Sequence, residues 1–169
     1  MFSNTKVGFY VNIASLRRAF GGKRHVARYT HTIDRKGRVI VPVKLREKLD
    51  GALVVTESVD DGFLAAYSPD QFEELKSKIL SLSATDVSIR LMRRRILGSA
   101  NLCEFDAQGR IMVPAFLWEH IGVSPGEEAC FIDVFSKIEI CSSAFFEQHM
   151  QASKSLAEMD LSKYDIPGL

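Results

Sequence analysis

The chain has 169 residues, of which 46% are hydrophobic and 25% charged, proportions typical of a soluble globular protein. At this length it can bury about two-thirds of its unfolded surface, enough for one compact domain. No apolar run approaches the ~20 residues that a membrane-spanning helix needs. Its three cysteines, Cys103, Cys130 and Cys141, lack metal-type spacing, and we interpret them as reduced thiols of a cytoplasmic protein.

The net charge of +1 conceals an uneven distribution along the chain. Residues 1–50 contain twelve Lys or Arg and three acidic residues, a balance of +9, whereas residues 51–169 contain ten and eighteen, a balance of −8. Such polarity suggests that one end of the molecule binds a polyanion. A solvated basic surface beside an acidic neighbour explains the same pattern without a polyanion.

A sequence frame occurs twice, as Ile33–Leu49 and as Phe105–Ile121, with a constant shift of 72 positions. Five identities within nine positions, in unbroken register, indicate an internal duplication. The identical residues are Asp34, Gly37, Arg38, Val41 and Pro42 in the first copy and Asp106, Gly109, Arg110, Val113 and Pro114 in the second.

Each copy is predicted to form a β-hairpin followed by a short helix. In Asp-x-x-Gly the carboxylate can accept turn N–H groups and the glycine tolerates positive φ, which favours a type I turn with a bulge. The paired Asp and Gly residues are therefore interpreted as turn-building, and the arginine that follows should emerge beside the hairpin tip. Proline cannot donate to a central strand ladder, but it suits the first turn of a helix.

The two Asp-x-x-x-Arg motifs, Asp34–Arg38 and Asp106–Arg110, are each followed by an apolar strand, a proline and a helix. In this they resemble the MraZ family of bacterial transcriptional regulators, and Arg93–Ala100 resembles the inter-repeat helix of that family. The resemblance covers about residues 29–151. It implies an α+β fold, an internally duplicated swapped-hairpin (double-split) β-barrel with short helices. The related AbrB domain builds such a barrel as a homodimer, and the resemblance implies that one chain does so here.

Between the two hairpin–helix units the sequence predicts two strands and two helices. The first helix begins with a capping box of Ser68 and Gln71. The second is capped by Thr85 or Asp86. The second copy follows the same order and ends in a helix from about Ala144, capped by Ser143, to near Met159. The remaining helices and strands are expected at residues 43–49, 53–56, 63–67, 115–121, 129–134 and 138–141.

These elements divide the chain into five parts. They are an N-terminal extension that we expect to be flexible (1–28), a first repeat (29–84), an inter-repeat helix (85–100), a second repeat (101–160) and a loose tail (161–169).

Features shared by the two copies are candidates for architecture, and features of one copy are candidates for function. The first turn contains Arg35–Lys36, whereas the second contains Ala107–Gln108. A two-stranded β-ribbon fits the major groove of DNA, where arginine bonds guanine while lysines bind flanking phosphates. We expect Arg110 to brace Asp106 or a subunit contact. The predicted DNA-binding residues are Arg38 first, then Lys36 and Arg35, with Lys44 and Arg46 close by.

The resemblance implies a sequence-specific DNA-binding transcriptional regulator. It would repress its own cell-division and cell-wall gene cluster by binding repeated promoter elements in double-stranded DNA as a ring-like homo-oligomer. A location in the cytoplasm, at the nucleoid, follows. No cofactor, metal or small-molecule substrate is expected, because the four histidines show no ligand spacing and no Gly-rich phosphate loop is present. We expect Trp118 to lie in the core.

Other interpretations remain open from the sequence alone. The barrel would also suit a protein-interaction scaffold whose basic tip docks an acidic protein. Asp34 and Asp106 are conceivable as the carboxylate dyad of a hydrolase, although an arginine four residues on favours the ionised form of each. Arg90 and Arg93–Arg95 near a helix C-terminus can serve the helix dipole, a neighbouring subunit or DNA.

Overall fold

The computed structural model describes residues 28–153, 155, 158–160 and 162–164. The predictions for the N-terminal extension up to residue 27, and for the tail from residue 165, therefore lie outside the described residues.

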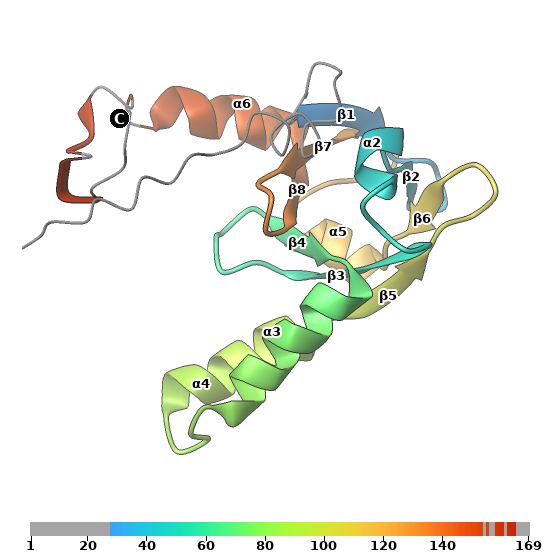
Figure 1. Cartoon of the computed structure of the whole chain (residues 1–169). Helices are drawn as coiled ribbons and strands as arrows, with labels where there is room; N and C mark the ends of the chain where they lie inside the picture. Colours follow the sequence, from blue (N-terminus) through green and yellow to red (C-terminus); the bar gives the residue numbers. More distant parts are fainter. Residues whose placement is uncertain (1–27, 154, 156–157, 161, 165–169) are drawn as a thin grey trace, which may run out of the picture.

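The chain has an α+β fold in which one order of elements occurs twice (Figure 1). The first half comprises β1 (Arg28–Thr32), β2 (Arg38–Ile40), α2 (Val43–Arg46), β3 (Ala52–Glu57), β4 (Leu64–Tyr67) and α3 (Pro69–Ser81). The connection comprises α4 (Val87–Met92) and the π-helix η1 (Arg93–Leu97). The second half comprises β5 (Asn101–Glu104), β6 (Arg110–Met112), α5 (Ala115–His120), β7 (Glu128–Asp133), β8 (Ile138–Ser142) and α6 (Ser143–Ala152), followed by the 3-10 helix η3 (Ser162–Tyr164).

The strands form one six-stranded sheet and one two-stranded ribbon. The sheet has the order β1-β7-β8-β4-β3-β5, and the ribbon consists of β2 and β6. All neighbouring strands are antiparallel. Each half contributes three strands to the sheet and one to the ribbon. An approximate twofold relation therefore exchanges β1 with β5, β3 with β7 and β4 with β8.

The predicted hairpin pairing is wrong, although both turns form. Asp34 N–H donates to the Arg38 carbonyl at 2.8 Å, and Gly37 N–H donates to the Asp34 carbonyl at 2.9 Å. Beyond the turn, however, β1 pairs with β7, and in the second half β5 pairs with β3. Strands β2 and β6 pair with each other, Val39 opposite Ile111. The two halves thus exchange strands, because each edge finds its hydrogen-bond partners in the other half. Closure of the sheet and the ribbon into a barrel is not seen.

The core is built by both halves with matching side chains. Apolar residues of the ribbon, of the two short helices and of the central sheet strands form one buried cluster. Trp118 belongs to it and is 3% exposed, so its predicted place in the core is confirmed. Each buried Val, Ile or Leu side chain contributes about 1.5–3 kcal/mol. Equivalent members of the two copies are Val39 and Ile111, Val41 and Val113, and Leu45 and Leu117.

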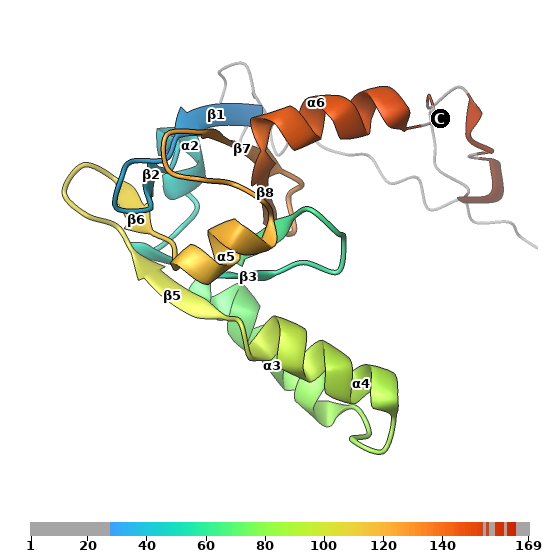
Figure 2. The ribbon, with the colours of Figure 1, turned by 180° about the vertical axis from the view of Figure 1, so that it is seen from behind.

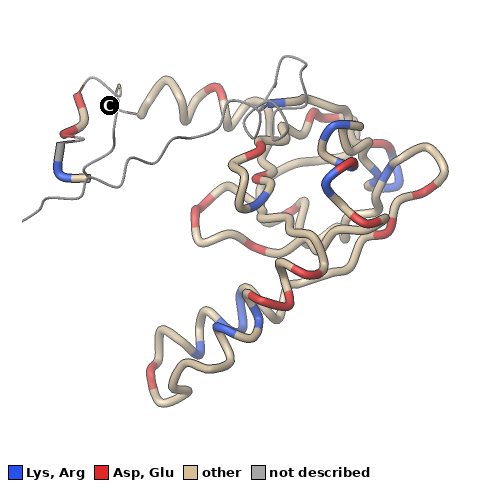
Figure 3. Tube along the Cα trace, viewed as in Figure 1, with Lys and Arg blue, Asp and Glu red and all other residues tan. Residues whose placement is uncertain are grey.

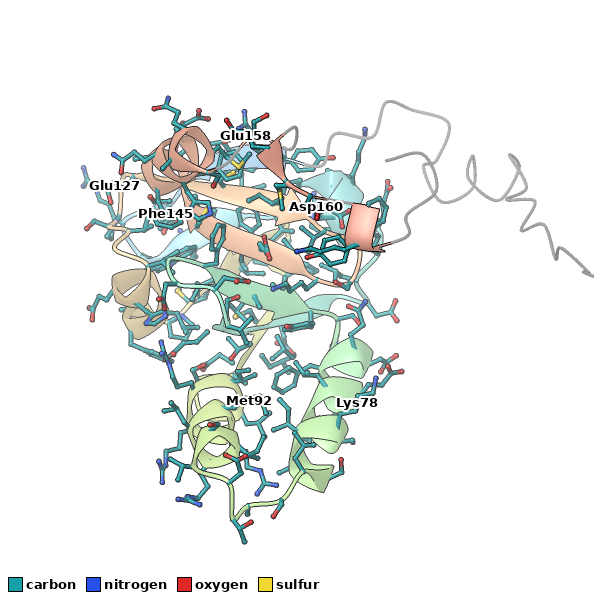
Figure 4. The ribbon with its side chains drawn as sticks, turned by 90° about the vertical axis from the view of Figure 1, so that its left-hand side faces the viewer. Lys78, Met92, Glu127, Phe145, Glu158 and Asp160 are labelled. Atoms are coloured by element: carbon teal, nitrogen blue, oxygen red, sulfur yellow. The ribbon has the colours of Figure 1, made fainter. Side chains whose placement is uncertain are left out.

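Helices α3 and α4 with η1 form an arm that projects from the sheet (Figures 1 and 2). Lys78 on α3 and Met92 on α4 mark the two sides of this arm in Figure 4. The predicted capping box is confirmed, since Ser68 Oγ accepts the Gln71 N–H and Gln71 Oε1 accepts the Ser68 N–H. Of the two candidates for the next cap, Asp86 is the N-cap residue and accepts the Ser88 N–H.

The starts of α2 at Val43 and of α5 at Ala115 agree with the predicted ranges 43–49 and 115–121, whereas the position of the prolines and the start of α6 differ from the prediction. Pro42 and Pro114 have extended backbone at the N-cap, one residue before the helices rather than within their first turns. Helix α6 is capped by Ser142 instead of Ser143, because Ser142 Oγ accepts the Phe145 N–H at 2.8 Å. The helix ends at Ala152 rather than near Met159. The next residue, Ser153, has an extended backbone, and its hydroxyl donates to the His149 carbonyl.

No described helix combines the length and the hydrophobicity that a bilayer span requires. The three cysteines are free and buried. Burial raises the pKa of the Cys103 thiol to about 11, so this side chain is neutral and unreactive at neutral pH.

Candidate nucleic-acid interface

The Asp34 carboxylate holds the first turn by accepting hydrogen bonds from backbone N–H groups and from the Arg38 side chain. Asp34 Oδ1 accepts the N–H groups of Lys36 at 2.8 Å and Arg38 at 3.0 Å. Asp34 Oδ2 accepts Arg38 Nε at 2.7 Å and Arg38 Nη2 at 2.6 Å. Gly37 has a φ of +79°, a left-handed conformation that glycine adopts without strain.

The second turn repeats this geometry. Asp106 Oδ1 accepts the N–H groups of Gln108 and Arg110, both at 2.9 Å. Asp106 Oδ2 accepts Arg110 Nε and Nη2, both at 2.7 Å. The duplicated motif therefore specifies one rigid unit, a turn with an aspartate and a paired arginine.

These contacts lower the pKa of both carboxyl groups. The hydrogen bond from the Arg38 side chain is the largest cause at Asp34, whose pKa falls from 3.8 to about 2. At Asp106 the backbone N–H of Arg110 is the largest cause, followed by the Arg110 side chain, and the pKa is again lowered. Both aspartates are thus fully ionised at neutral pH.

The two motif arginines occupy equivalent positions. Arg38 is 29% exposed and Arg110 is 24% exposed, and each forms a bidentate pair with its own aspartate. Arg110 Nη1 also lies 4.0 Å from Asp34 Oδ2, which links the two turns. The sequence assigned DNA contact to Arg38 and bracing to Arg110, whereas the geometry gives both arginines the bracing contact. DNA contact by Arg38 stays a prediction.

The turns differ in the two residues between the aspartate and the glycine. Arg35 and Lys36 are exposed on the first turn, and among the described residues neither side chain has a hydrogen bond or an ion pair. The corresponding Ala107 and Gln108 are uncharged and exposed. In Figure 3, Lys and Arg colour the first turn and α2. The uncompensated positive charge of the turns thus lies on the first one.

Each turn is packed against the short helix of the other repeat. Trp118 Nε1 in α5 donates to the Gly37 carbonyl at 3.0 Å. Arg46 in α2, the counterpart of Trp118, covers the second turn, where a Cβ added to Gly109 would come within 2.3 Å of its guanidinium. Arg46 Nε also donates to the Val41 carbonyl at 2.9 Å. Arg46 therefore lies against the second turn, although the sequence grouped it with the first. Its DNA contact stays a prediction, as does that of the half-exposed Lys44.

The arginine cluster of the arm is largely occupied within the chain. Arg93 Nη2 donates to the carbonyls at the C-terminus of α3, of which Leu82 at 2.7 Å is the nearest. Arg90 bonds two carbonyls of the loop between the helices, and Arg95 pairs with Glu57 at 2.7 Å. Arg94 is exposed and has no side-chain partner among the described residues. Arg90 and Arg93 thus support the arm itself, and Arg95 joins the arm to β3.

A sequence model of the MraZ protein family matches residues 25–95 and matches again at residues 96–165. The chain belongs to the MraZ family. It contains two MraZ repeats, which account for the duplicated frame and for the approximate twofold relation of the fold.

Curated relatives agree with this assignment. The chain is 37% identical over 128 residues to the transcriptional regulator MraZ of Caldanaerobacter subterraneus, covering 76% of this chain and 87% of the relative. It is 38% identical over 124 residues to that of Thermoanaerobacter sp. strain X514, covering 73% and 85%. It is 33% identical over 138 residues to that of Shewanella denitrificans, covering 79% and 90%. The solution structure of PHS018 from Pyrococcus horikoshii shares 17% identity over 69% of this chain and 87% of its own, with a TM-score of 0.29.

MraZ proteins are transcriptional regulators and not enzymes, so the hydrolase interpretation of Asp34 and Asp106 is dropped. The geometry agrees, since each carboxylate is neutralised by its own arginine. Among the described residues, no group of three or more His, Cys, Asp or Glu could hold a metal ion.

Sequence reasoning missed the crossed bracing of the MraZ turns, in which the short helix of each repeat holds the turn of the other repeat. Trp118 was expected in the core, but its hydrogen bond to Gly37 spans 81 positions and joins two repeats. The available signal was that Arg46 and Trp118 share one position of the duplicated frame. Two large side chains with N–H donors at equivalent sites suggest a common structural role.

Proposed function

We propose that the chain regulates transcription by binding double-stranded DNA with the face that carries the first turn. The observation that carries this proposal is the difference between the turns. Both have the same aspartate–arginine frame, yet only the first adds two exposed cations, Arg35 and Lys36. Phosphates neutralised by such side chains release counterions and thereby supply affinity.

The bidentate pair with Asp34 leaves Arg38 able to contact a base. A guanidinium has five N–H donors, and Asp34 accepts one from Nε and one from Nη2. The Nη1 donors and the second Nη2 donor remain for guanine O6 and N7. Because Asp34 fixes the guanidinium, less side-chain entropy is lost on binding than for a mobile arginine.

One turn per chain reaches few phosphates, so we propose that DNA is bound by an oligomer. Several first turns on one frame raise affinity through effective concentration. The ring-like homo-oligomer, the repeated promoter elements and autorepression of the cell-division and cell-wall cluster belong to this proposal, as does a cytoplasmic, nucleoid-associated location. The swapped-hairpin barrel and the five-part division of the chain are also proposed. The strand exchange between the repeats supports the barrel.

The test compares two substitutions that remove equivalent ion pairs, Arg38–Asp34 in the first turn and Arg110–Asp106 in the second. Arg38→Ala and Arg110→Ala each release one aspartate, so both should lower thermal stability to a similar degree. Only Arg38→Ala should abolish the mobility shift of the DNA directly upstream of the coding region. If Arg110→Ala abolishes binding equally, or Arg38→Ala binds as the wild type does, the assignment of DNA contact to the first turn is wrong.

A further inference from the structure

The β2–β6 ribbon turns one side to the core and the other to solvent. Side chains of a strand alternate between its two faces, and in both strands the middle residue points inward. Val39 and Ile111 stand opposite each other and are buried. The outer face of the ribbon therefore consists of Arg38, Ile40, Arg110 and Met112.

Both repeats place a large apolar side chain on this outer face. Ile40 is 42% exposed and Met112 is 50% exposed, and the two residues occupy the same position of the duplicated frame. A single exposed apolar side chain is ordinary on a protein surface. Here, however, two stand at equivalent positions, outside the core cluster and each opposite a motif arginine. Core packing does not account for this pair, which is available to a partner.

The outer face also carries guanidinium groups. Arg38 stands opposite Met112 and Arg110 opposite Ile40, and side chains so placed have Cβ atoms about 4.5–5.5 Å apart. Arg110 Nη1 lies 4.0 Å from Asp34 Oδ2, so the two aspartate–arginine pairs meet on this face. A purely apolar partner would bury these charged groups without hydrogen bonds, which is costly. The partner must therefore offer acceptors as well as apolar groups.

One of the two apolar residues adjoins the cations of the first turn. Met112 of the second repeat lines a surface depression together with Arg35 and Lys36. These two cations bind phosphates in the proposed function. The outer face is thus continuous with the surface that we assign to DNA, and its charges favour DNA over a second copy of the chain as the partner.

The major groove presents the groups that the outer face requires. Guanine offers O6 and N7 as acceptors, and thymine offers its C5-methyl group for apolar contact. Arg38 keeps N–H donors for guanine, and Ile40 and Met112 are the apolar groups beside it. We propose that Ile40 and Met112 contact thymine methyl groups and thereby determine the sequence that the chain binds. This inference rests on the proposed function.

The geometry of the ribbon sets the spacing of the bases. Ile40 lies two residues along β2 from Arg38, a distance of about 6.8 Å. Successive base pairs are about 3.4 Å apart. Ile40 should therefore contact a thymine two base pairs from the guanine that Arg38 contacts. Met112 lies level with Arg38 across the ribbon and should contact a thymine in the adjacent base pair.

Mobility shifts of altered DNA by the wild-type chain test the methyl contacts. Each thymine in the footprint on the upstream DNA is replaced singly by deoxyuridine, which lacks only the C5-methyl group. Replacement at two thymines with the stated spacing should weaken binding about fourfold each, as expected for one buried methyl group. The salt dependence should not change, because no phosphate contact is lost. If no replacement weakens binding, the proposal is overturned while the proposed function stands. If the wild type binds no upstream DNA, both are wrong.

Substitutions then assign each methyl group to a side chain. Ile40→Ala should bind thymine and deoxyuridine equally at one of the two positions, and Met112→Ala should do so at the other. Each variant should keep its sensitivity at the remaining position. Met150→Ala is the matched control, because Met150 is 55% exposed on α6, and it should keep both sensitivities. If both ribbon variants respond to deoxyuridine as the wild type does, the proposal is wrong.

Light scattering separates contact with DNA from contact between subunits. Both ribbon variants should form particles of the wild-type mass, because the outer face contacts DNA and not another copy of the chain. A smaller particle in either variant would assign Ile40 and Met112 to an interface between copies and would overturn the proposal.

Discussion

The aspartate–arginine pair is the structural unit that the duplication repeats. In both copies one carboxylate oxygen holds the turn backbone and the other orients a guanidinium. Function is therefore expected in what differs around the pair, namely Arg35 and Lys36 on one turn and the residues that cover each turn. These differences lie at three positions of the shared frame, those of Arg35, Lys36 and Arg46 in the first copy.

The Asp34 pair predicts a particular dependence of stability on pH. A folded-state pKa of about 2, against 3.8 ordinarily, stabilises the fold above pH 3.8, and the contribution is lost as the pH falls through about 2. Asp34→Asn should therefore lower Tm at pH 7 and flatten the fall in Tm between pH 4 and pH 2, as measured by circular dichroism. Glu74→Gln, at an exposed position of α3, is the control. A mutant with the wild-type pH profile would show that the pair does not stabilise the turn.

Trp118→Phe should loosen the first turn while keeping the core apolar. The ring fills most of the same volume, but the Gly37 carbonyl loses its donor. Such a loss costs about 1–3 kcal/mol of unfolding free energy, which urea denaturation can measure. DNA affinity should fall as well. Phe116→Leu, on the same helix but 47% exposed, should change neither quantity appreciably. A fully stable Trp118→Phe variant would contradict the bracing role.

At the level of elements, the helical arm is held together by the arginines that its sequence presents. Arg93 Nη2 donates to the carbonyls of Ile79, Leu80 and Leu82 and so satisfies the C-terminal end of α3. From the sequence, Arg90 and Arg93–Arg95 could serve the dipole at the C-terminus of the helix on which they themselves lie. The contact is instead made to the neighbouring helix, which the turn between α3 and α4 brings alongside.

Arg93→Met should therefore destabilise the arm. Hydrogen bonds from a charged group contribute about 1.5–3 kcal/mol, and the three carbonyls have no substitute donor in methionine. Arg94→Met is the matched control, because Arg94 is exposed and has no side-chain partner among the described residues. Hydrogen exchange of α3 and α4 should accelerate in the first variant only. Equal exchange in both would contradict the capping role of Arg93.

Local elements followed from the sequence more reliably than their partners did. The capping box of Ser68 and Gln71 and the strands near residues 53–56 and 129–134 were predicted because their causes are local. The pairing of β1 with β7 was not, because any apolar strand edge offers the same backbone groups. For the same reason the turns and their charges were foreseen, whereas the crossed bracing by Arg46 and Trp118 was not.

For the whole molecule, the exchange of strands makes each repeat dependent on the other. The pairs β1–β7, β2–β6, β3–β5 and β4–β8 all join the first half to the second. Residues 28–84 alone should consequently be unfolded as a monomer. They should fold only with residues 101–160 added, or by forming a homodimer that supplies the missing edges. Circular dichroism with light scattering checks this, and a folded monomeric half would contradict it.

DNA binding as proposed for this chain requires that the first turn carries the phosphate contacts. The most direct measurement is the salt dependence of binding to the upstream DNA for the wild type and for Arg35→Gln/Lys36→Gln. Each lost phosphate contact reduces the slope of log K against log salt by about 0.9, so the double variant should bind more weakly, with a slope smaller by about 2 per engaged chain. An unchanged slope and affinity would show that the DNA is bound elsewhere.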